Sequence, residues 1–258
     1  MFSIRSHMDI FLRGMKEVFN PKRIWEELKS LDLNEKLLLS FMIFSVFLAF
    51  IFDKNGSGGL LGFVTGVFTI VNLILIARGK LTNYLWGIGS CVSWLAVAVN
   101  NMLIGDIVSQ TFHLLMQFIG IYAWQKVMEH ASTTEIEPKK LSRKAAVLSF
   151  VGAIVLYFAM VYFSIKAGGN LVWLSSAILP ASIIAQFLMT YGYSSQWIFW
   201  LTVNIINIII WSIRLAEGGS SALSMLVLNS MMFINSLYGI YVWYAIRDKM
   251  KRILNKKG

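Results

Sequence analysis

The chain has 258 residues, of which 57% are hydrophobic and 14% are charged, and its mean hydropathy is +0.66. This composition excludes an ordinary soluble globular domain and predicts an all-α polytopic membrane protein. The formal net charge of +10 would suit a nucleic-acid-binding protein, but the basic residues gather at the ends of apolar stretches, so no nucleic-acid partner is expected.

The N-terminal segment, residues 1–36, is expected to lie on the cytoplasmic membrane surface. Apolar residues such as Phe11 and Phe19 alternate with Lys and Arg, and Pro21 interrupts the pattern. A helix of this kind rests in the interface, where its basic side chains meet anionic lipid headgroups. Residues 37–52 follow as an extra N-terminal transmembrane helix, the shortest of the predicted spans.

Apolar stretches near the ~20 residues that cross a bilayer predict about eight transmembrane helices. They cover 37–52, 60–77, 83–103, 107–127, 145–165, 171–190, 197–216 and 221–246. With this arrangement nearly all Lys and Arg residues fall on one side of the membrane, and only Lys54, Lys166 and Arg214 remain for the other. By the positive-inside rule both termini are cytoplasmic, including the basic tail at 247–258.

Matching strings indicate an internal repeat. Residues 120–124 and 239–243 share glycine, isoleucine, tyrosine and tryptophan, and Gly79 aligns with Gly192. We therefore predict two three-helix repeats at 60–127 and 171–246, joined by residues 128–170 as a cytoplasmic loop and linker helix. Three helices plus one crossing give both repeats the same orientation, as in transporters of the SWEET type, with substrate between them near mid-membrane.

The stretch from Trp197 to Ala216 carries a polar and aromatic stripe. Its members recur three and four residues apart, which at about 100° per residue places them on one helical face. They are Trp197, Trp200, Asn204, Asn207, Trp211 and Arg214. An amide without a partner in hydrocarbon costs several kcal/mol, so these Asn side chains need a neighbouring helix, water or a bound solute. Helix packing and a substrate pathway both explain the stripe, and the pathway is favoured.

Similar stripes mark two neighbouring stretches. Gln110, His113, Gln117 and Trp124 share one face of the fourth stretch, and Trp94 belongs to a weaker stripe on the third. A cavity walled by such groups suits a flat aromatic or cationic solute that carries amide and hydroxyl groups.

The acidic residues argue against an ion-driven carrier. All of them fall in loops, termini or the edges of the predicted spans, whereas proton- and sodium-coupled carriers usually place an ionisable group at mid-membrane. For His113 a neutral hydrogen-bonding role is favoured over protonation. The sequence shows no Ser–His–Asp set and no Cys/His cluster with metal spacing, and Cys91 is the single cysteine. No catalytic residue, metal or cofactor is expected, so the chain is predicted not to be an enzyme.

The segment around Trp197, Trp200, Asn204 and Asn207, together with the closing string 238–243 and its echo at 120–124, resembles the bacterial PnuC-type vitamin transporters. The resemblance covers about residues 60–246. It implies a SWEET-like bundle of three, one and three helices in the bacterial cytoplasmic (inner) membrane, arranged as a homotrimer. It also implies facilitated diffusion (uniport) of nicotinamide riboside, which cytosolic phosphorylation then traps for pyridine nucleotide biosynthesis.

The expected ligand is therefore a small molecule, with the lipid bilayer as surroundings. We expect amides to bond its carboxamide and ribose and rings to enclose its base, through Trp94, Gln110, Gln117, Trp124, Trp200, Asn204, Asn207, Asn235, Tyr238 and Trp243. Three alternatives remain open on the residues alone: a thiamine or riboflavin carrier, a SWEET-like sugar carrier, and a non-transporting membrane receptor.

Overall fold

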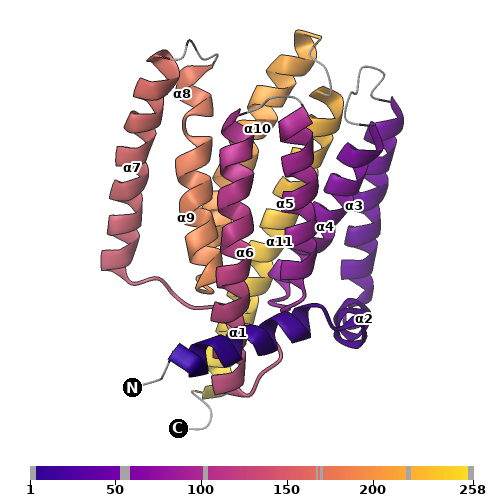
Figure 1. Cartoon of the computed structure of the whole chain (residues 1–258), viewed down its shortest axis with the longest axis vertical. Coiled ribbons are helices and arrows are strands. Elements are labelled where there is room, and N and C mark those ends of the chain that lie inside the picture. The colour runs from indigo at the N-terminus through magenta and orange to yellow at the C-terminus, as the bar shows by residue number, and fades with distance from the viewer. Residues whose placement is uncertain are drawn as a thin grey trace. The chain divides into compact units, whose positions relative to one another are not determined.

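The computed structural model describes residues 4–52, 59–100, 104–166, 168, 171–218 and 222–254. Within these ranges every regular element is a helix, apart from the isolated β-bridges Lys80–Glu135 and Lys139–Tyr193 (Figure 1). The all-α prediction is confirmed. The chain divides into two compact units, one formed by Met1–Phe50, Gly58–Glu137 and Thr190–Gly192, the other by Ile51–Ser57, Pro138–Met189 and Tyr193–Gly258.

In the described part of the chain, six helical segments are long and apolar enough to cross a membrane. They are Leu33–Phe52, Leu60–Ala77, Arg143–Lys166, Val172–Thr190, Gln196–Ala216 and Ala222–Ala245. They match six of the predicted spans. The two other predicted spans, 83–103 and 107–127, correspond to the helices Asn83–Asn100 and Ile104–Ala131, which are not among these six. The total of eight transmembrane helices therefore stays a prediction.

The first unit holds three long helices behind an N-terminal segment. These are α4 (Gly59–Ala77), α5 (Asn83–Asn100) and α6 (Ile104–Ala131), and α5 contacts both of the others. The preceding helix α3 (Leu33–Phe52) packs on α4, since a Cβ at Gly66 would lie 2.7 Å from Val46 and the Phe47 and Phe63 rings meet at 5.6 Å. Glycine at position 66 thus permits the close approach of the extra N-terminal helix.

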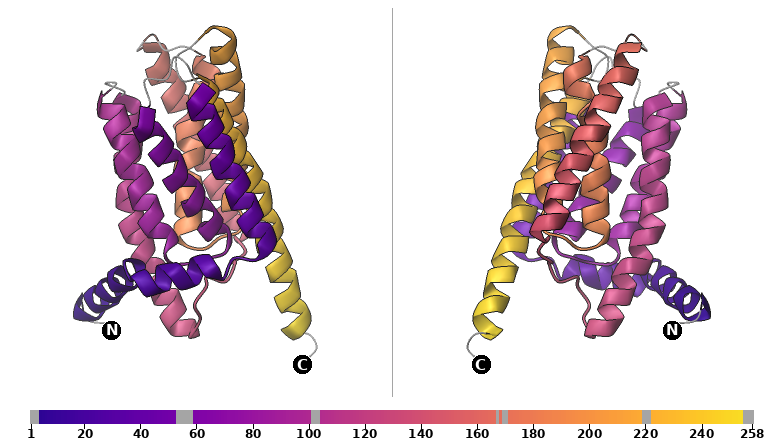
Figure 2. Two further views of the ribbon diagram at one scale, coloured as in Figure 1. Left: turned by 90° about the vertical axis from the view of Figure 1, so that its right-hand side faces the viewer. Right: turned by 90° about the vertical axis from the view of Figure 1, so that its left-hand side faces the viewer.

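Two short helices precede α3. Helix α1 (Ile4–Val18) and helix α2 (Pro21–Lys29) lie across the lower ends of the long helices of this unit (Figure 2). Pro21 occupies the first turn of α2, where its missing N–H is not needed, and Asn20 caps the helix by accepting from the Lys22 N–H at 3.0 Å. The predicted interfacial segment is therefore a pair of helices that divides at Pro21.

The second unit begins with the linker helix α7 (Arg143–Lys166), followed by α8 (Val172–Ser175), α9 (Ile178–Thr190), α10 (Gln196–Ala216) and α11 (Ala222–Leu254). The sixth predicted span is broken between α8 and α9, close to Pro180. Because proline has no N–H to give to the carbonyl four residues earlier, the chain cannot continue as one regular helix through Ser176. This agrees with the position of the proline in the sequence.

The turns α4–α5 and α9–α10 have the same backbone. Gly79 and Gly192 adopt φ of +65° and +74°, a region that glycine enters without strain. The residue after each glycine donates its N–H back into the preceding helix, from Lys80 to Leu75 at 2.9 Å and from Tyr193 to Leu188 at 2.8 Å. This shared geometry confirms the internal repeat that Gly79 and Gly192 indicated.

Candidate functional site

A ring pair joins α5 to α6 in the first repeat. The Tyr84 and Trp124 rings meet edge to face with their centroids 5.2 Å apart, and both side chains are buried. Gly120 lies one helical turn before Trp124, and a Cβ at that position would overlap the Tyr84 ring. Glycine is therefore required where the ring crosses α6.

The second repeat has the same arrangement. Trp197 of α10 meets Trp243 of α11 edge to face at 6.0 Å, and a Cβ at Gly239 would lie 2.5 Å from the Trp197 ring. The strings at 120–124 and 239–243 thus recur because each supplies one glycine and one tryptophan to receive a ring from the neighbouring helix. We call these two arrangements the ring sockets.

Polar pairs follow the ring sockets along the same helices. In the first repeat Gln117 of α6 lies within hydrogen-bonding reach of the Cys91 thiol of α5. At the aligned positions of the second repeat the Asn204 amide donates to Ser236 Oγ at 2.9 Å. The same two helix positions are joined in both repeats, although the chemistry of the pair differs.

Buried amide atoms without hydrogen-bond partners occur on these faces. In the described part of the chain they include Gln117 Oε1, Asn204 Oδ1 and both amide atoms of Asn235, which is 0% exposed. A buried amide that lacks partners is destabilising by about 1–3 kcal/mol, so such groups indicate a bound solute or water.

Glycine also makes room for polar groups inside the first repeat. The Asn72 side chain of α4 donates to the Asn83 carbonyl at 2.8 Å. A Cβ at Gly87 would lie 2.9 Å from the side-chain nitrogen of Asn72 and closer still to Gln117 Oε1. The aligned residue of the second repeat is Trp200. The two repeats therefore differ at this position, where one has glycine and the other has a large ring.

The predicted site residues fall into three sets by burial and contacts. Trp124 and Trp243 are 1% exposed and belong to the ring sockets. Gln117, Asn204 and Asn235 are buried, and each has at least one amide atom without a hydrogen-bond partner among the described residues. The remaining residues are half-buried on α5, α6, α10 and α11, namely Trp94, Gln110, Trp200, Asn207 and Tyr238.

Three residues that shape these faces lie outside the predicted substrate-binding set, although Trp197 belongs to the predicted stripe. Tyr84 and Trp197 fill the ring sockets, and Ser236 accepts from Asn204. The repeat itself carried the signal, since it aligns Tyr84 with Trp197 and Gln117 with Ser236.

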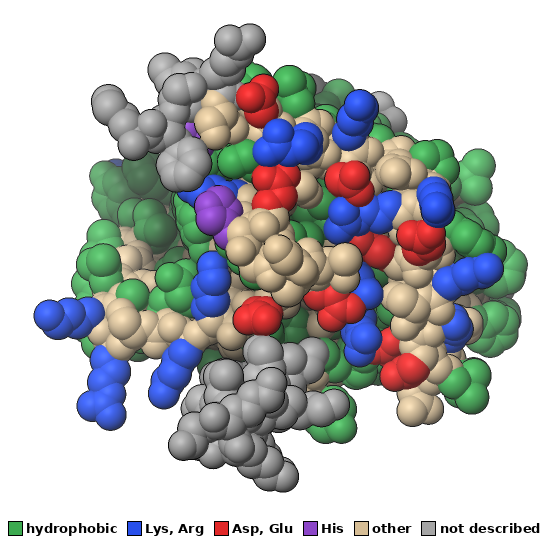
Figure 3. Space-filling view, turned by 90° about the horizontal axis from the view of Figure 1, so that it is seen from below, with side chains coloured by type: hydrophobic (Ala, Val, Ile, Leu, Met, Phe, Trp, Pro, Cys, Tyr) green, Lys and Arg blue, Asp and Glu red, His purple; other side chains and the backbone are tan. Residues whose placement is uncertain are grey.

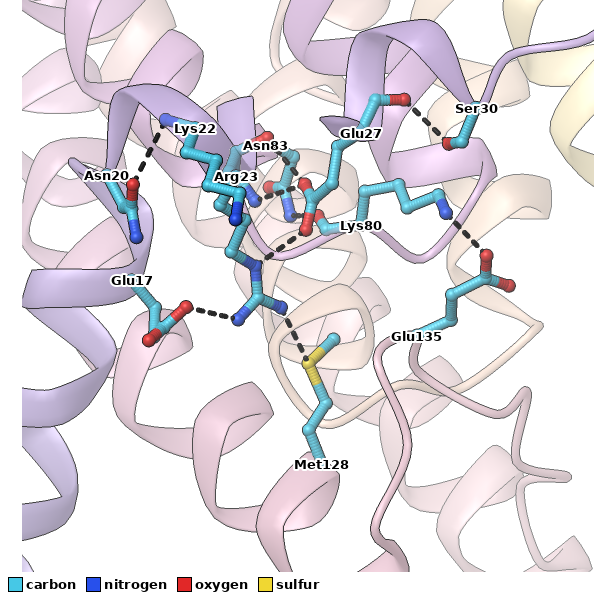
Figure 4. A network of polar contacts seen from close by, with 11 residues as sticks. Glu17, Asn20, Lys22, Arg23, Glu27, Ser30, Lys80, Asn83, Met128 and Glu135 are labelled. Carbon is cyan, nitrogen blue, oxygen red and sulfur yellow. Dashed lines mark hydrogen bonds and ion pairs between the residues drawn. The ribbon is translucent and has the colours of Figure 1, made fainter. Parts of the chain in front are cut away.

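An ionic network lies beside the α4–α5 turn (Figure 4). The Glu27 carboxylate of α2 accepts from the Thr82 N–H at 3.0 Å and from the Thr82 hydroxyl, and it pairs with Arg23 at 2.8 Å. Arg23 also reaches Glu17, and Lys80 pairs with Glu135. Helix α2 is thus attached to the start of α5 by a buried carboxylate.

Two further ion pairs tie the N-terminal helices to this unit. Arg13 of α1 binds Glu129 of α6 at 2.8 Å, which holds the pKa of Glu129 at about 2, and Arg78 binds Glu35 at 3.2 Å. Figure 3 shows acidic and basic side chains gathered together on one face of the molecule. Within the described residues, no three His, Cys, Asp or Glu side chains are grouped so that they would hold a metal ion.

Comparison with known proteins decides the family. The model of the nicotinamide mononucleotide transporter family matches residues 59–245. The chain belongs to this family. The matched region begins with α4, so α1 to α3 precede it. Membership also makes the chain a membrane transporter rather than an enzyme.

Individual relatives agree with the family. The chain is similar to the nicotinamide riboside transporter PnuC of Neisseria mucosa, with 29% identity over 75% of this chain and 74% of that one. The PnuC of Haemophilus influenzae is 27% identical, over 71% and 78%. The crystal structure of the vitamin B3 transporter PnuC superimposes with a TM-score of 0.73 at 26% identity, covering 87% of this chain and 97% of that one. The resemblance seen in the sequence is confirmed.

Proposed function

We propose that the protein is a uniporter that brings nicotinamide riboside into the cell, where phosphorylation of the substrate prevents its return. Family membership and the names of the relatives support the substrate. The absence of any carboxylate from the middle of the predicted spans supports facilitated diffusion, since an ion-coupled carrier usually needs an ionisable group there.

The observation that carries this proposal is the Asn235 amide. Asn235 is 0% exposed, and neither its oxygen nor its nitrogen has a hydrogen-bond partner among the described residues. A primary amide offers both an acceptor and two donors, which match a carboxamide or a ribose hydroxyl of the substrate. Asn204 Oδ1 adds an acceptor on α10, the helix that contacts α11.

The aromatic residues take two roles in the proposal. Trp200 and Tyr238 are half-buried and stack on the nicotinamide ring, whose positive charge the π-systems attract by ~0.5–2 kcal/mol for each contact. Trp124 and Trp243 each position the ring of the socket in their own repeat. Trp94, Gln110, Gln117 and Asn207 complete the proposed set on the strength of the sequence pattern.

A matched pair of variants on α11 tests the role of Asn235. Asn229 is 4% exposed, but its amide donates to the Met225 carbonyl of its own helix at 2.8 Å. In proteoliposomes, Asn235→Leu should lower uptake of labelled nicotinamide riboside by at least ~10-fold, the loss expected for one hydrogen bond of about 1.4 kcal/mol. Asn229→Leu should keep most of the uptake.

The stability of the same variants separates binding from folding. If the Asn235 amide forms its hydrogen bonds only with bound substrate, Asn235→Leu removes an unsatisfied amide from the free protein and leaves the melting temperature unchanged or higher. At the same concentration, nicotinamide riboside should raise the melting temperature of the wild type and raise that of Asn235→Leu clearly less. A strongly destabilised Asn235→Leu with normal uptake per folded molecule would show that the amide is structural.

Substrate and mechanism are tested in the same vesicles. Competition by thiamine and riboflavin at equal concentration decides among the aromatic vitamins, and flux for none of them would contradict the proposal. Uptake that stops at equal concentrations inside and outside, with or without ionophores, supports uniport. Concentrative uptake that ionophores abolish would refute it.

Assembly and orientation complete the proposal. We infer a homotrimer with both termini in the cytoplasm, from the resemblance and from the distribution of basic residues. Light scattering of the purified protein measures the subunit number. Labelling of a cysteine introduced at Ser6 in intact spheroplasts, compared with permeabilised ones, reports the side on which the N-terminal helix lies.

A further inference from the structure

The two equivalent turns of the repeats differ in what they bind. In the α4–α5 turn, Thr82 stands three residues after Gly79, and both its N–H and its hydroxyl donate to Glu27. This places a carboxylate at the N-terminal end of α5, where the helix dipole and the open N–H groups favour negative charge. The first turn therefore shows which ligand this backbone accepts.

The α9–α10 turn presents the same donors without an acceptor. Ser195 stands three residues after Gly192, its Oγ is buried with no partner in the described structure, and it makes no side-chain cap. Its neighbour Gln196 is 0% exposed, with neither amide atom bonded, and Ser194 Oγ is likewise buried and unpartnered. Leaving this group of donors buried and unused would cost several kcal/mol.

The surrounding charge favours an anion. Lys139 contacts the turn directly, since its carbonyl accepts from the Ser194 N–H at 3.0 Å, and Lys140 follows it. Both lysine side chains are exposed and appear in none of the salt bridges of the described residues. In the first repeat the turn carries its own lysine, Lys80, which aligns with Tyr193 and is paired with Glu135.

We propose that the α9–α10 turn is an anion-binding site, which takes a phosphate or carboxylate group through Ser195 and Gln196 as the α4–α5 turn takes Glu27. The ligand comes from outside the chain, either as a free phosphate compound or as the headgroup of an anionic lipid. Because α10 also carries Asn204, occupancy of this turn stabilises the helix that bears part of the proposed substrate surface. The site is independent of the identity of the transported substrate.

The test uses the purified full chain in an uncharged detergent. Inorganic phosphate, added against chloride at constant ionic strength, should raise the melting temperature by about 3 °C at ten times its dissociation constant. Ser195→Ala, alone and combined with Gln196→Leu, should remove this rise. Thr82→Val, at the equivalent position of the first repeat, should keep it, because there the acceptor is Glu27.

A second arm identifies the source of the anion. In nanodiscs, replacement of phosphatidylcholine by phosphatidylglycerol should stabilise the wild type and not Ser195→Ala if a lipid headgroup fills the turn. A rise with free phosphate alone assigns a soluble ligand. Stabilisation by neither probe overturns the proposal, as does a phosphate response that Ser195→Ala retains.

The exposed carboxylate of Glu137, in the same loop as Lys139, is the competing occupant within the chain. If Glu137 fills the turn in solution, phosphate will act only on Glu137→Gln, and this outcome also overturns the proposal. If the site is open, wild type and Glu137→Gln respond alike.

Discussion

Substitution of Gly239 by alanine tests whether the ring sockets hold each repeat together. The added Cβ would lie 2.5 Å from two atoms of the Trp197 ring, a separation that real Cβ atoms do not tolerate. Trp197 is 0% exposed and rests edge-on against Trp243, so its ring has no free space to move into. Helix α11 must therefore move away from α10, or the ring must leave its rotamer.

The magnitude follows from two opposing effects. Overpacking of a buried site costs ~1–3 kcal/mol, whereas alanine in place of glycine inside a helix gains up to about 1 kcal/mol. Gly152 of α7 provides the matched control, because a Cβ there meets nothing within 4 Å. Gly152→Ala measures the gain alone, and Gly239→Ala should melt lower than Gly152→Ala by about 5 °C for a chain of this size.

The assay is thermal unfolding of the purified variants in one detergent, detected by fluorescence size-exclusion chromatography. The double variant Gly239→Ala/Trp197→Leu should recover part of the loss, since leucine leaves room for the methyl group. If Gly239→Ala melts at the same temperature as Gly152→Ala, the ring does not rest on Gly239 and the reasoning is wrong. The same holds if the stability losses of Gly239→Ala and Trp197→Leu simply add in the double variant.

Two further predictions concern the attachment of the N-terminal helices. Glu27→Gln should weaken the bonds to Thr82 and leave Arg23 with Glu17 as its ion-pair partner. We expect this change to lower the melting temperature and to speed hydrogen exchange in α2. Unchanged exchange would show that Glu27 does not anchor the helix. The Arg13 guanidinium lowers the pKa of Glu129 to about 2, so the pair stabilises the fold above the unfolded value of about 4.5 and this contribution is lost between about pH 4.5 and 2. Glu129→Gln should remove that part of the acid sensitivity, measured by melting temperature against pH, and an unaltered profile would assign it to other carboxylates.

Much of the fold was predictable because hydrocarbon imposes strict rules on a chain. Each span needs a long apolar segment, and the apolar stretches from 37–52 to 221–246 accordingly correspond to helices of the structure. Repetition of Gly79 at Gly192, and of the string at 120–124 at 239–243, was visible because equivalent packing demands equivalent glycines. The break in the sixth span lies close to Pro180, a residue that removes one backbone N–H from the helix.

Side-chain partners were beyond the sequence, since helical spacing tells which residues share a face but not what that face meets. Trp124 and Trp197 lie on stripes that suited a substrate surface equally well, yet packing places them against Tyr84 and Trp243. The attachment of Glu27 to Thr82 joins residues that no local pattern connects.

The sequence by itself therefore determined the environment of the chain, its helices and its repeated plan, because these depend on composition and on period. Only the tertiary structure decided which polar atoms are satisfied within the chain and which, like the Asn235 amide and Ser195 Oγ, remain available. The physical reason is that hydrogen bonding depends on contacts between helices, whereas helix formation in a membrane depends on each segment alone.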